Sequence, residues 1–171
     1  AVRLMRRAYD KSGDENDLKR LAELLCFKED NASLSAEYVT KYCEEKSFKE
    51  YCKTAEQGES YYDLMTSRSV KSLYASGKVD DALKKASDYL SFYSSAYPSG
   101  SALRALMFSA AEKKDKQTLT KILEKLESFD LSSFTEKEKQ TIEDDKLNIN
   151  QIITLFQLVS HGHLIFQMEK I

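Results

Sequence analysis

The fold of this chain is decided by residues 61–100, which read YYDLMTSRSVKSLYASGKVDDALKKASDYLSFYSSAYPSG. Apolar side chains recur in this stretch at helical spacing on both sides of a short break at Ser76-Gly77-Lys78. The stretch therefore predicts two helices joined by a tight turn, the unit that helical-repeat proteins stack. The apolar residues are Leu64, Val70, Leu73 and Tyr74 before the break, and Ala82, Leu83, Ala86, Tyr89, Leu90 and Tyr93 after it.

The composition agrees with a helical protein. The chain has 171 residues, of which 42% are hydrophobic and 32% are charged, and it is long enough to bury a core. One proline and five glycines leave little material for the turns of a β fold. These values predict an all-α fold. A net charge of −2 gives no bulk reason to expect a nucleic acid or an anionic membrane as a partner.

No apolar run approaches the roughly 20 residues that a membrane-crossing helix needs. The longest run, residues 149–159, is interrupted by four polar side chains, so we interpret it as a core helix and expect no membrane partner. The chain begins with Ala1, and its first residues already have the pattern of the middle of a helix. We therefore take it as an excised or processed segment, in which an upstream targeting signal would not be visible.

Cys26, Cys43 and Cys52 form an odd set without the CxxC spacing of metal or redox motifs. We expect free thiols that pack as small apolar residues. Such thiols fit a reducing compartment, such as the cytosol or the mitochondrial matrix.

Helix boundaries in the first third follow from capping residues and glycine. The first helix is expected to end near Ser12-Gly13, and the next one runs through residues 18–26. Ser33 or Ser35 is expected to cap the third helix. After a break at residues 44–46, a further helix is expected to end at residues 57–59, with Gly58 in the left-handed conformation of a C-cap.

The last third contains a capping box. In Thr135-Glu136-Lys137-Glu138, the threonine hydroxyl and the glutamate can each accept a hydrogen bond from the other's backbone N–H. Upstream, residues 94–100 are typical of a linker, and a break is expected at residues 113–116. Downstream, the helix is predicted to break at His161-Gly162-His163, and a new element begins at residue 164.

The breaks recur along the chain at spacings of about 32, 32 and 36 residues. In the best match, residues 69–90 fall on residues 105–126 at an offset of 36, which pairs Leu83 with Leu119. This pattern predicts a helix-turn-helix repeat array, an α-solenoid, that is part of a longer array; the alternative is an irregular helical bundle with coincidental spacing. The expected hairpins of this single segment are residues 1–30, 33–58, 61–97, 99–130 and 135–171.

Two hairpin families place glycine and alanine as residues 77–83 do, the tetratricopeptide and the pentatricopeptide repeats. Gly77, like Gly13 at the first break, allows the chain to turn tightly, and Ala82 allows the two helices to approach closely. Tetratricopeptide units repeat every 34 residues, and their large aromatic residue would fall near Ala86, which is small. The offset of 36 and Pro98, just before the next unit, are closer to the pentatricopeptide pattern.

Residues 66–70, the SGKVDDAL turn and the PSGSALRAL entry to the next unit resemble the pentatricopeptide-repeat family, in particular members found in animal mitochondria. The resemblance implies an RNA-associated protein of the mitochondrial matrix that stabilises messenger RNA and supports its polyadenylation and translation; without it, the chain would be assigned to the cytoplasm. The implied partners are single-stranded RNA and a small protein with an RNA-recognition motif.

In members of this family that read RNA, the fifth residue of a unit helps to select the base and is usually Asn, Ser or Thr. Counted from Gly77, the fifth residue here is Arg68, and Arg104 follows 36 residues later. This departure argues against base-specific readout, although two arginines one repeat apart can follow phosphates. Arg3, Arg6 and Arg7 share a helical face and could extend such a basic stripe. The alternative is that all five are solvated arginines on exposed helix faces.

The sequence offers no support for catalysis. It has no glycine-rich phosphate loop and no serine-histidine-acid arrangement. His161 and His163 lack a third ligand at a helical offset, so we expect no metal site. We predict a non-enzymatic protein without a cofactor.

Three functional hypotheses follow. The first is an RNA-associated scaffold in which basic residues such as Arg68 and Arg104 line the inner surface. The second is a tetratricopeptide-like scaffold that holds a helix or peptide of a partner protein in a groove with an apolar or mixed-charge surface. The third is a structural subunit of a large ribonucleoprotein, such as a mitochondrial ribosome.

Overall fold

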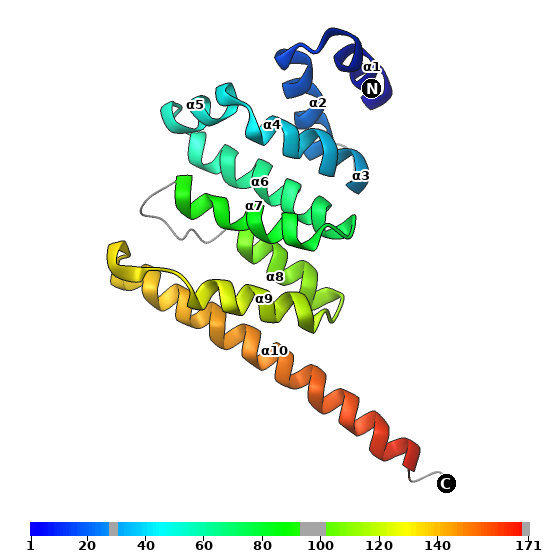
Figure 1. Ribbon diagram of the computed structural model, residues 1–171, viewed down its shortest axis with the longest axis vertical. Coiled ribbons are helices and arrows are strands. Elements are labelled where there is room, and N and C mark those ends of the chain that lie inside the picture. Colours follow the sequence, from blue (N-terminus) through cyan, green and yellow to red (C-terminus); the bar gives the residue numbers. More distant parts are fainter. Residues whose placement is uncertain (28–30, 93–101, 169–171) are drawn as a thin grey trace. The chain divides into compact units, whose positions relative to one another are not determined.

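The computed structural model describes residues 1–27, 31–92 and 102–168, and their side chains except those of residues 89–92, 133 and 160–168. Every regular element in these ranges is helical, which confirms the all-α prediction (Figure 1). The predicted linker at residues 94–100 lies outside the described residues. The elements are α1 (Val2–Ser12), α2 (Glu15–Phe27), α3 (Ala32–Leu34), the π-helical turn η1 (Ser35–Val39), α4 (Thr40–Glu44), α5 (Lys46–Thr54), α6 (Gly58–Ala75), α7 (Val79–Phe92), α8 (Ala102–Glu112), α9 (Lys116–Glu127), the 3-10 turn η2 (Leu131–Ser133) and α10 (Glu136–Met168).

The chain divides into two compact units. Unit 1 comprises Ala1–Phe92 and Ser99–Leu106, and unit 2 comprises Tyr93–Pro98 and Met107–Ile171. In unit 1, α1 packs on α2, α2 packs on η1, and α6 lies against η1, α5 and α7. In unit 2, α9 packs on α10. In both units the helices therefore pack mainly against elements that are close in the sequence.

The core of unit 1 is apolar and partly aromatic. Phe48 of α5 is fully buried, and its ring centroid lies 5.1 Å from that of Tyr42, 5.8 Å from Tyr61 and 5.7 Å from Tyr62. Burying aromatic rings in contact contributes more than their area alone. One predicted core residue of α6 is not in the core: Leu64 is 44% exposed.

In the described part of the chain, three helix-helix turns contain a residue in the left-handed conformation. Gly13 has a φ of 63° and Gly77 a φ of 79°. Lys114 adopts the same conformation, with a φ of 54°, between α8 and α9. Each of these residues lies two positions before the first residue of the following helix. Glycine adopts this conformation without the steric cost that other residues have.

The turns define the register of the hairpins. At the α6–α7 turn, the N–H groups of Gly77 and Lys78 donate to carbonyls three and five residues earlier, at 3.0 and 2.9 Å. At the α8–α9 turn, the N–H groups of Lys114 and Asp115 make the same two hydrogen bonds, at 3.0 and 2.9 Å. The structural offset is therefore 37 residues (from 77 to 114), one more than the 36 predicted, and Gly13 precedes Gly77 by 64.

The burial of side chains follows the structural register, by which we mean the alignment of α2, α7 and α9 on the left-handed residues that precede them. At these offsets Ala82 corresponds to Leu18 and Leu119, and the three side chains are 0%, 1% and 0% exposed. The predicted pairing of Leu83 with Leu119 was therefore wrong by one residue. Its cause is Lys114, which takes the left-handed position without a glycine to mark it.

The helix caps partly follow the predictions. The capping box is confirmed: the Glu138 N–H donates to Thr135 Oγ1 at 3.3 Å, and the Thr135 N–H donates to Glu138 Oε2 at 2.7 Å. The cap of the third helix is not one of the predicted serines. Asn31 Oδ1 accepts from the Leu34 N–H at 3.0 Å, while Ser33 lies inside α3 and Ser35 inside η1.

The predicted break at His161-Gly162-His163 is wrong, because α10 runs without interruption from Glu136 to Met168. Residues 135–171 therefore contain one long helix in place of the expected hairpin. A glycine inside a helix costs only about 1 kcal/mol relative to alanine, and the apolar residues on both sides keep their helical spacing.

Gly58 has a different role from the predicted one. It is the first residue of α6 and does not have a positive φ. A Cβ on Gly58 would lie 2.6 Å from the carbonyl carbon of Cys52 and 2.8 Å from its Cα. These atoms belong to the backbone of α5, so they cannot rotate away. Only glycine lets the chain reverse so tightly between α5 and α6.

We expect Gly58→Ala to destabilise the protein by about 1–3 kcal/mol, because the methyl group must displace the backbone of α5. Urea unfolding followed by circular dichroism measures this loss. Gln57→Ala is the matched control: this neighbouring side chain is exposed and makes no capping hydrogen bond, so its effect should stay within about 0.5 kcal/mol. Equal midpoints for Gly58→Ala and the unmodified chain would contradict this role.

Candidate functional site

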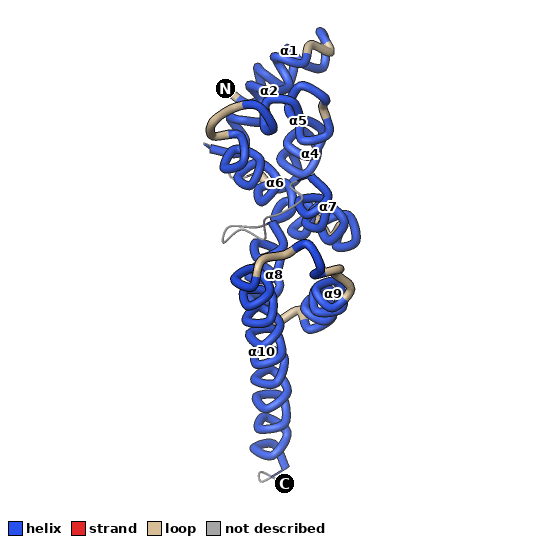
Figure 2. Tube along the Cα trace, turned by 90° about the vertical axis from the view of Figure 1, so that its left-hand side faces the viewer, coloured by secondary structure: helices blue, strands red, loops and turns tan. Residues whose placement is uncertain are grey.

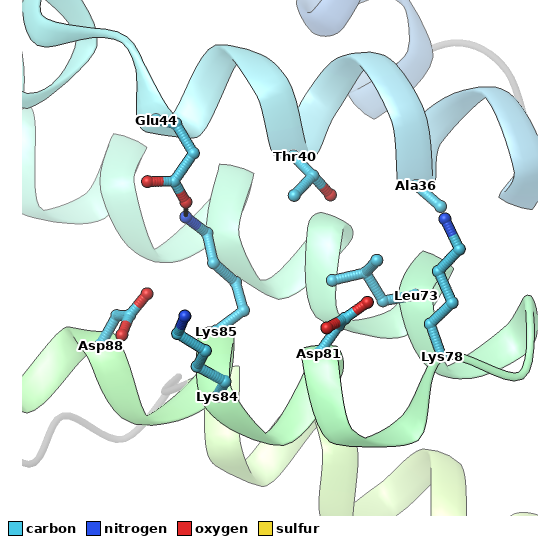
Figure 3. Close-up of a pocket in the computed structure, with 9 residues that line it drawn as sticks. All are labelled: Ala36, Thr40, Glu44, Leu73, Lys78, Asp81, Lys84, Lys85 and Asp88. Carbon is cyan, nitrogen blue, oxygen red and sulfur yellow. Dashed lines mark hydrogen bonds and ion pairs between the residues drawn. The ribbon is translucent and has the colours of Figure 1, made fainter.

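A pocket of about 270 Å³ lies in unit 1 between the helical stretch η1–α4 and α7 (Figure 3). We call it the α4–α7 pocket. Its walls come from two hairpins, and α6 contributes an apolar side chain between them. The lining residues are Ala36, Thr40, Glu44, Leu73, Lys78, Asp81, Lys84, Lys85 and Asp88.

One face of α7 supplies four of the charged groups. Asp81, Lys84, Lys85 and Asp88 are spaced at i, i+3, i+4 and i+7, so they project from the same side of the helix. The turn before α7 adds Lys78, next to the left-handed Gly77. With Glu44 the pocket has three ammonium and three carboxylate groups, and its formal charges cancel.

Lys85 is the unusual member of this set. Its side chain is only 6% exposed, and its ammonium group forms an ion pair with Glu44. In the structural register Lys85 corresponds to Leu21 and Ile122, which are 0% and 1% exposed. A lysine thus takes a position that α2 and α9, aligned on their left-handed turns, fill with a buried apolar side chain. Charged side chains are almost never buried unless they are paired.

Sequence reasoning missed Lys85, because a lysine in a charged helical stretch is normally solvated. The structural register is the signal that identifies it. With an offset of 36, Lys85 would fall on the half-buried Lys121; with 37 it falls on the buried Ile122.

Glu44 connects three helices. It is the last residue of α4, and its carboxylate pairs with Lys85 of α7 and, at 3.2 Å, with the Lys49 ammonium of α5. Burial opposes ionisation of this carboxyl group, but the two lysines outweigh it and lower its pKa. Glu44 therefore remains ionised and keeps the ammonium group of Lys85 paired.

Asp88 lies at the same end of the pocket (Figure 3). Burial raises its pKa; Lys85 opposes that increase, and Glu44 adds to it. Its carboxylate is consequently a partly desolvated acceptor with lysines nearby. Such a group gains from an additional hydrogen-bond donor or cation.

The π-helical turn η1 shapes the other wall. An extra residue in a helical turn changes the direction of the side chains that follow, and such turns occur often at functional sites. Ala36 of η1 and Thr40 line the pocket, and the hydroxyl groups of Thr40 and Ser69 lie 2.6 Å apart. The Ser35 hydroxyl is buried in the same turn and makes no hydrogen bond.

Two of the predicted RNA-contacting arginines lie outside this pocket. Arg68 of α6 is half-buried near Cys26 of α2: burial raises the pKa of that thiol, and the charge of Arg68 opposes the increase. Arg104 of α8 is also half-buried. Neither lines the pocket, whose cations are all lysines.

The arginines of α1 have different environments. Arg3 and Arg7 are exposed and lie one helical turn apart. Arg6 is half-buried, and its Nε lies 3.9 Å from Asp10 Oδ2. Arg3 and Arg7 are therefore the predicted RNA-contacting residues that are most open to solvent.

The predicted turn residues act by shaping the backbone. Gly13 and Gly77 provide left-handed turns, and Ala82 is fully buried in α7. Because Lys78 follows Gly77 directly, this turn also positions one end of the α4–α7 pocket.

Within the described residues, no group of three or more His, Cys, Asp or Glu side chains is placed to hold a metal ion. The side chains of His161 and His163 are not among them. The three cysteines are free thiols, and burial raises the pKa of both Cys43 and Cys52 to about 12. These two thiols stay protonated at neutral pH, which makes them poor nucleophiles.

Comparison of the chain with protein-family models, with curated proteins and with solved structures gives no match. In the described part of the chain, no helix has both the length and the apolar character that a membrane crossing requires.

We expect Lys85→Met and Glu44→Gln to affect stability in different ways. Lys85→Met should leave the free energy of unfolding unchanged or raise it, because apolar replacements of buried ion pairs are often neutral or stabilising. Glu44→Gln should lower it by about 1–3 kcal/mol, because Lys85 is then buried without its carboxylate. Urea unfolding of both variants measures the difference. A comparable decrease in both would mean that Lys85 is needed for folding itself.

Proposed function

We propose that this chain is a non-enzymatic helical-repeat scaffold whose α4–α7 pocket holds a segment of a partner protein. The observation that carries the proposal is Lys85, a buried charged residue at a position that equivalent helices fill with Leu21 and Ile122. A fold that needs only a core has no use for a lysine there.

Three features support the repeat architecture. Left-handed residues close the turns at Gly13, Gly77 and Lys114. Two of these turns share the same pair of hydrogen bonds. The equivalent core positions Leu18, Ala82 and Leu119 are all buried. In this proposal each pair of helices is one repeat, and neighbouring repeats cover each other's apolar faces.

The presence of Lys85 in the core favours a role in binding a partner over a purely structural role. Burying the Lys85–Glu44 pair costs desolvation energy that an apolar residue of similar size would not cost. The same arrangement places charged groups of both signs around a space that η1 and α7 leave open. Charged pairs at an interface select among partners more than they strengthen binding.

The charge pattern favours a peptide segment over a nucleic acid. Glu44, Asp81 and Asp88 would repel a phosphate chain along the same wall that carries the lysines. A protein segment can instead offer acidic and basic side chains in alternation, and its backbone can hydrogen-bond with groups such as Asp88. We therefore expect a partner segment that carries both signs of charge.

A selection of displayed random peptides tests this function. Peptides selected on the unmodified chain should alternate acidic and basic residues and bind with micromolar affinity. The double variant Asp81→Lys/Lys84→Glu inverts two exposed pocket charges and leaves the net charge unchanged. It should weaken the selected peptides by at least about tenfold, or 1.4 kcal/mol, and should bind charge-inverted peptides better.

Lys71→Glu is the control for this experiment, because Lys71 is an exposed residue of α6 that does not line the pocket. Its affinity for the selected peptides should change little. The proposal fails if no peptide is enriched, or if the pocket variant and the control weaken binding equally.

A second candidate function is RNA association, which the resemblance to pentatricopeptide repeats supports. The specific observation is α1, whose sequence VRLMRRAYDKS has four basic residues and one acidic residue. Arg3 and Arg7 are exposed on this helix. Two exposed guanidinium groups one turn apart can contact neighbouring phosphates without reading bases.

Fluorescence anisotropy with labelled single-stranded RNA tests this second function at about 50 and about 200 mM salt. We expect the affinity to fall with salt, and Arg3→Ala/Arg7→Ala to reduce the slope of log K against log salt by about 0.7 for each phosphate that these arginines neutralise. Arg68→Ala/Arg104→Ala tests the half-buried pair in the same way. Binding that none of the four arginines affects would refute the RNA function in this form.

A further inference from the structure

The C-terminal part of α10 differs in chemistry from the part that packs on α9. Ile142, Asp145 and Ile149 are buried, but none of the described side chains of residues 150–159 is buried. Leu155, Leu158 and Val159 are 58%, 64% and 62% exposed. Both views show this part of the helix extending beyond α9 (Figures 1 and 2). We call residues 147–168 the distal segment.

The distal segment has no Asp, Glu, Lys or Arg, whereas residues 136–146 have five acidic and three basic residues. At about 100° per residue, the apolar side chains of residues 147–159 cover about two thirds of the helix circumference. The eight apolar residues are Leu147, Ile149, Ile152, Ile153, Leu155, Phe156, Leu158 and Val159. A stripe of roughly 100° is enough to pack one neighbour, so this segment is suited to contacts on more than one side.

We propose that the distal segment pairs with the distal segment of a second copy of this chain, in antiparallel orientation. The face of α10 that makes the contact is the one turned away from Ile149 and α9. Its apolar side chains lie within about 120° of one another around the helix, and all four are exposed: Leu147, Leu155, Leu158 and Val159. Pairing over about 33 Å buries a mainly apolar area.

A second copy fits because the segment is self-complementary. It has no Asp, Glu, Lys or Arg, so two copies meet without repulsion between such side chains. Its exposed amides, Asn148, Asn150 and Gln151, each combine donors with acceptors, so they do not need a charged partner. A two-fold axis requires a surface of this kind, on which the same patch serves both partners.

Charge also selects the orientation. A parallel pair would bring the acidic run Glu143-Asp144-Asp145 of one copy beside that of the other. An antiparallel pair places these runs at opposite ends of the contact, and it opposes the two helix dipoles. The antiparallel arrangement therefore avoids the repulsion that the parallel one would create.

Sedimentation velocity on the 171-residue chain tests the proposal between about 1 and about 100 µM, a range that brackets a micromolar dissociation constant. We expect a monomer–dimer equilibrium with a transition in this range. Leu155→Glu/Leu158→Glu alters only exposed side chains and should keep the chain monomeric throughout. Leu4→Glu, which alters an α1 residue that is 70% exposed, is the control and should dimerise like the unmodified chain.

Cysteine crosslinking in a Cys26→Ser background tests the orientation. If the whole distal segment pairs antiparallel, Leu158 lies near its centre and Leu158→Cys should crosslink to its own copy. Asn148→Cys lies near one end and should not. Self-crosslinking at position 148 overturns the antiparallel arrangement.

Three outcomes overturn the proposal, two in sedimentation velocity and one in vesicle flotation. One is a monomer at every concentration, and another is a dimer that persists in Leu155→Glu/Leu158→Glu. The third is a monomer that floats with phosphatidylcholine vesicles, which would assign the distal segment to a lipid surface. None of these outcomes bears on the α4–α7 pocket, which lies in the other unit.

Discussion

Much of the structure depends on one constraint, the left-handed residue that closes the α1–α2, α6–α7 and α8–α9 turns. At Gly13 and Gly77 this conformation has little steric cost, whereas Lys114 adopts it at a cost of roughly 1–2 kcal/mol. Each of these residues lies two positions before the next helix, so each turn fixes which face of that helix meets its partner. The burial of Leu18, Ala82 and Leu119 follows from this register.

The register also reveals where the chain departs from simple core packing. The alignment places Lys85 at the same position as the buried Leu21 and Ile122, so the burial of a charged side chain there needs a physical explanation. Glu44 supplies the physical part of that explanation, because its carboxylate pairs with lysines on two other helices. A pair that links α4, α5 and α7 makes the shape of the pocket depend on the packing of two hairpins.

Features that depend on local signals could be predicted from the sequence. Apolar periodicity gave the helices of the first four hairpins, and the capping box at Thr135 was confirmed. Features that depend on tertiary contacts could not. Nothing in the sequence marks Lys114 as left-handed or η1 as a π turn, and Gly58 resembles a helix terminator until the backbone of α5 is placed beside it. The pocket could not be predicted for the same reason, because the sequence does not distinguish a buried lysine such as Lys85 from a solvated one.

The two proposed surfaces rely on different interactions, charge attraction in the pocket and apolar burial on α10, so their dependence on salt distinguishes them experimentally. The pocket relies on charged groups around Lys85 and Glu44, whose attraction to a partner weakens as salt screens it. The distal segment of α10 relies on exposed apolar residues such as Leu155 and Leu158, whose association does not depend on charge and strengthens in salts that favour burial. In these proposals, one contact can form without weakening the other. Residues 147–168 have no Asp, Glu, Lys or Arg, whereas the pocket has six such side chains, so salt should affect the two proposed contacts in opposite directions.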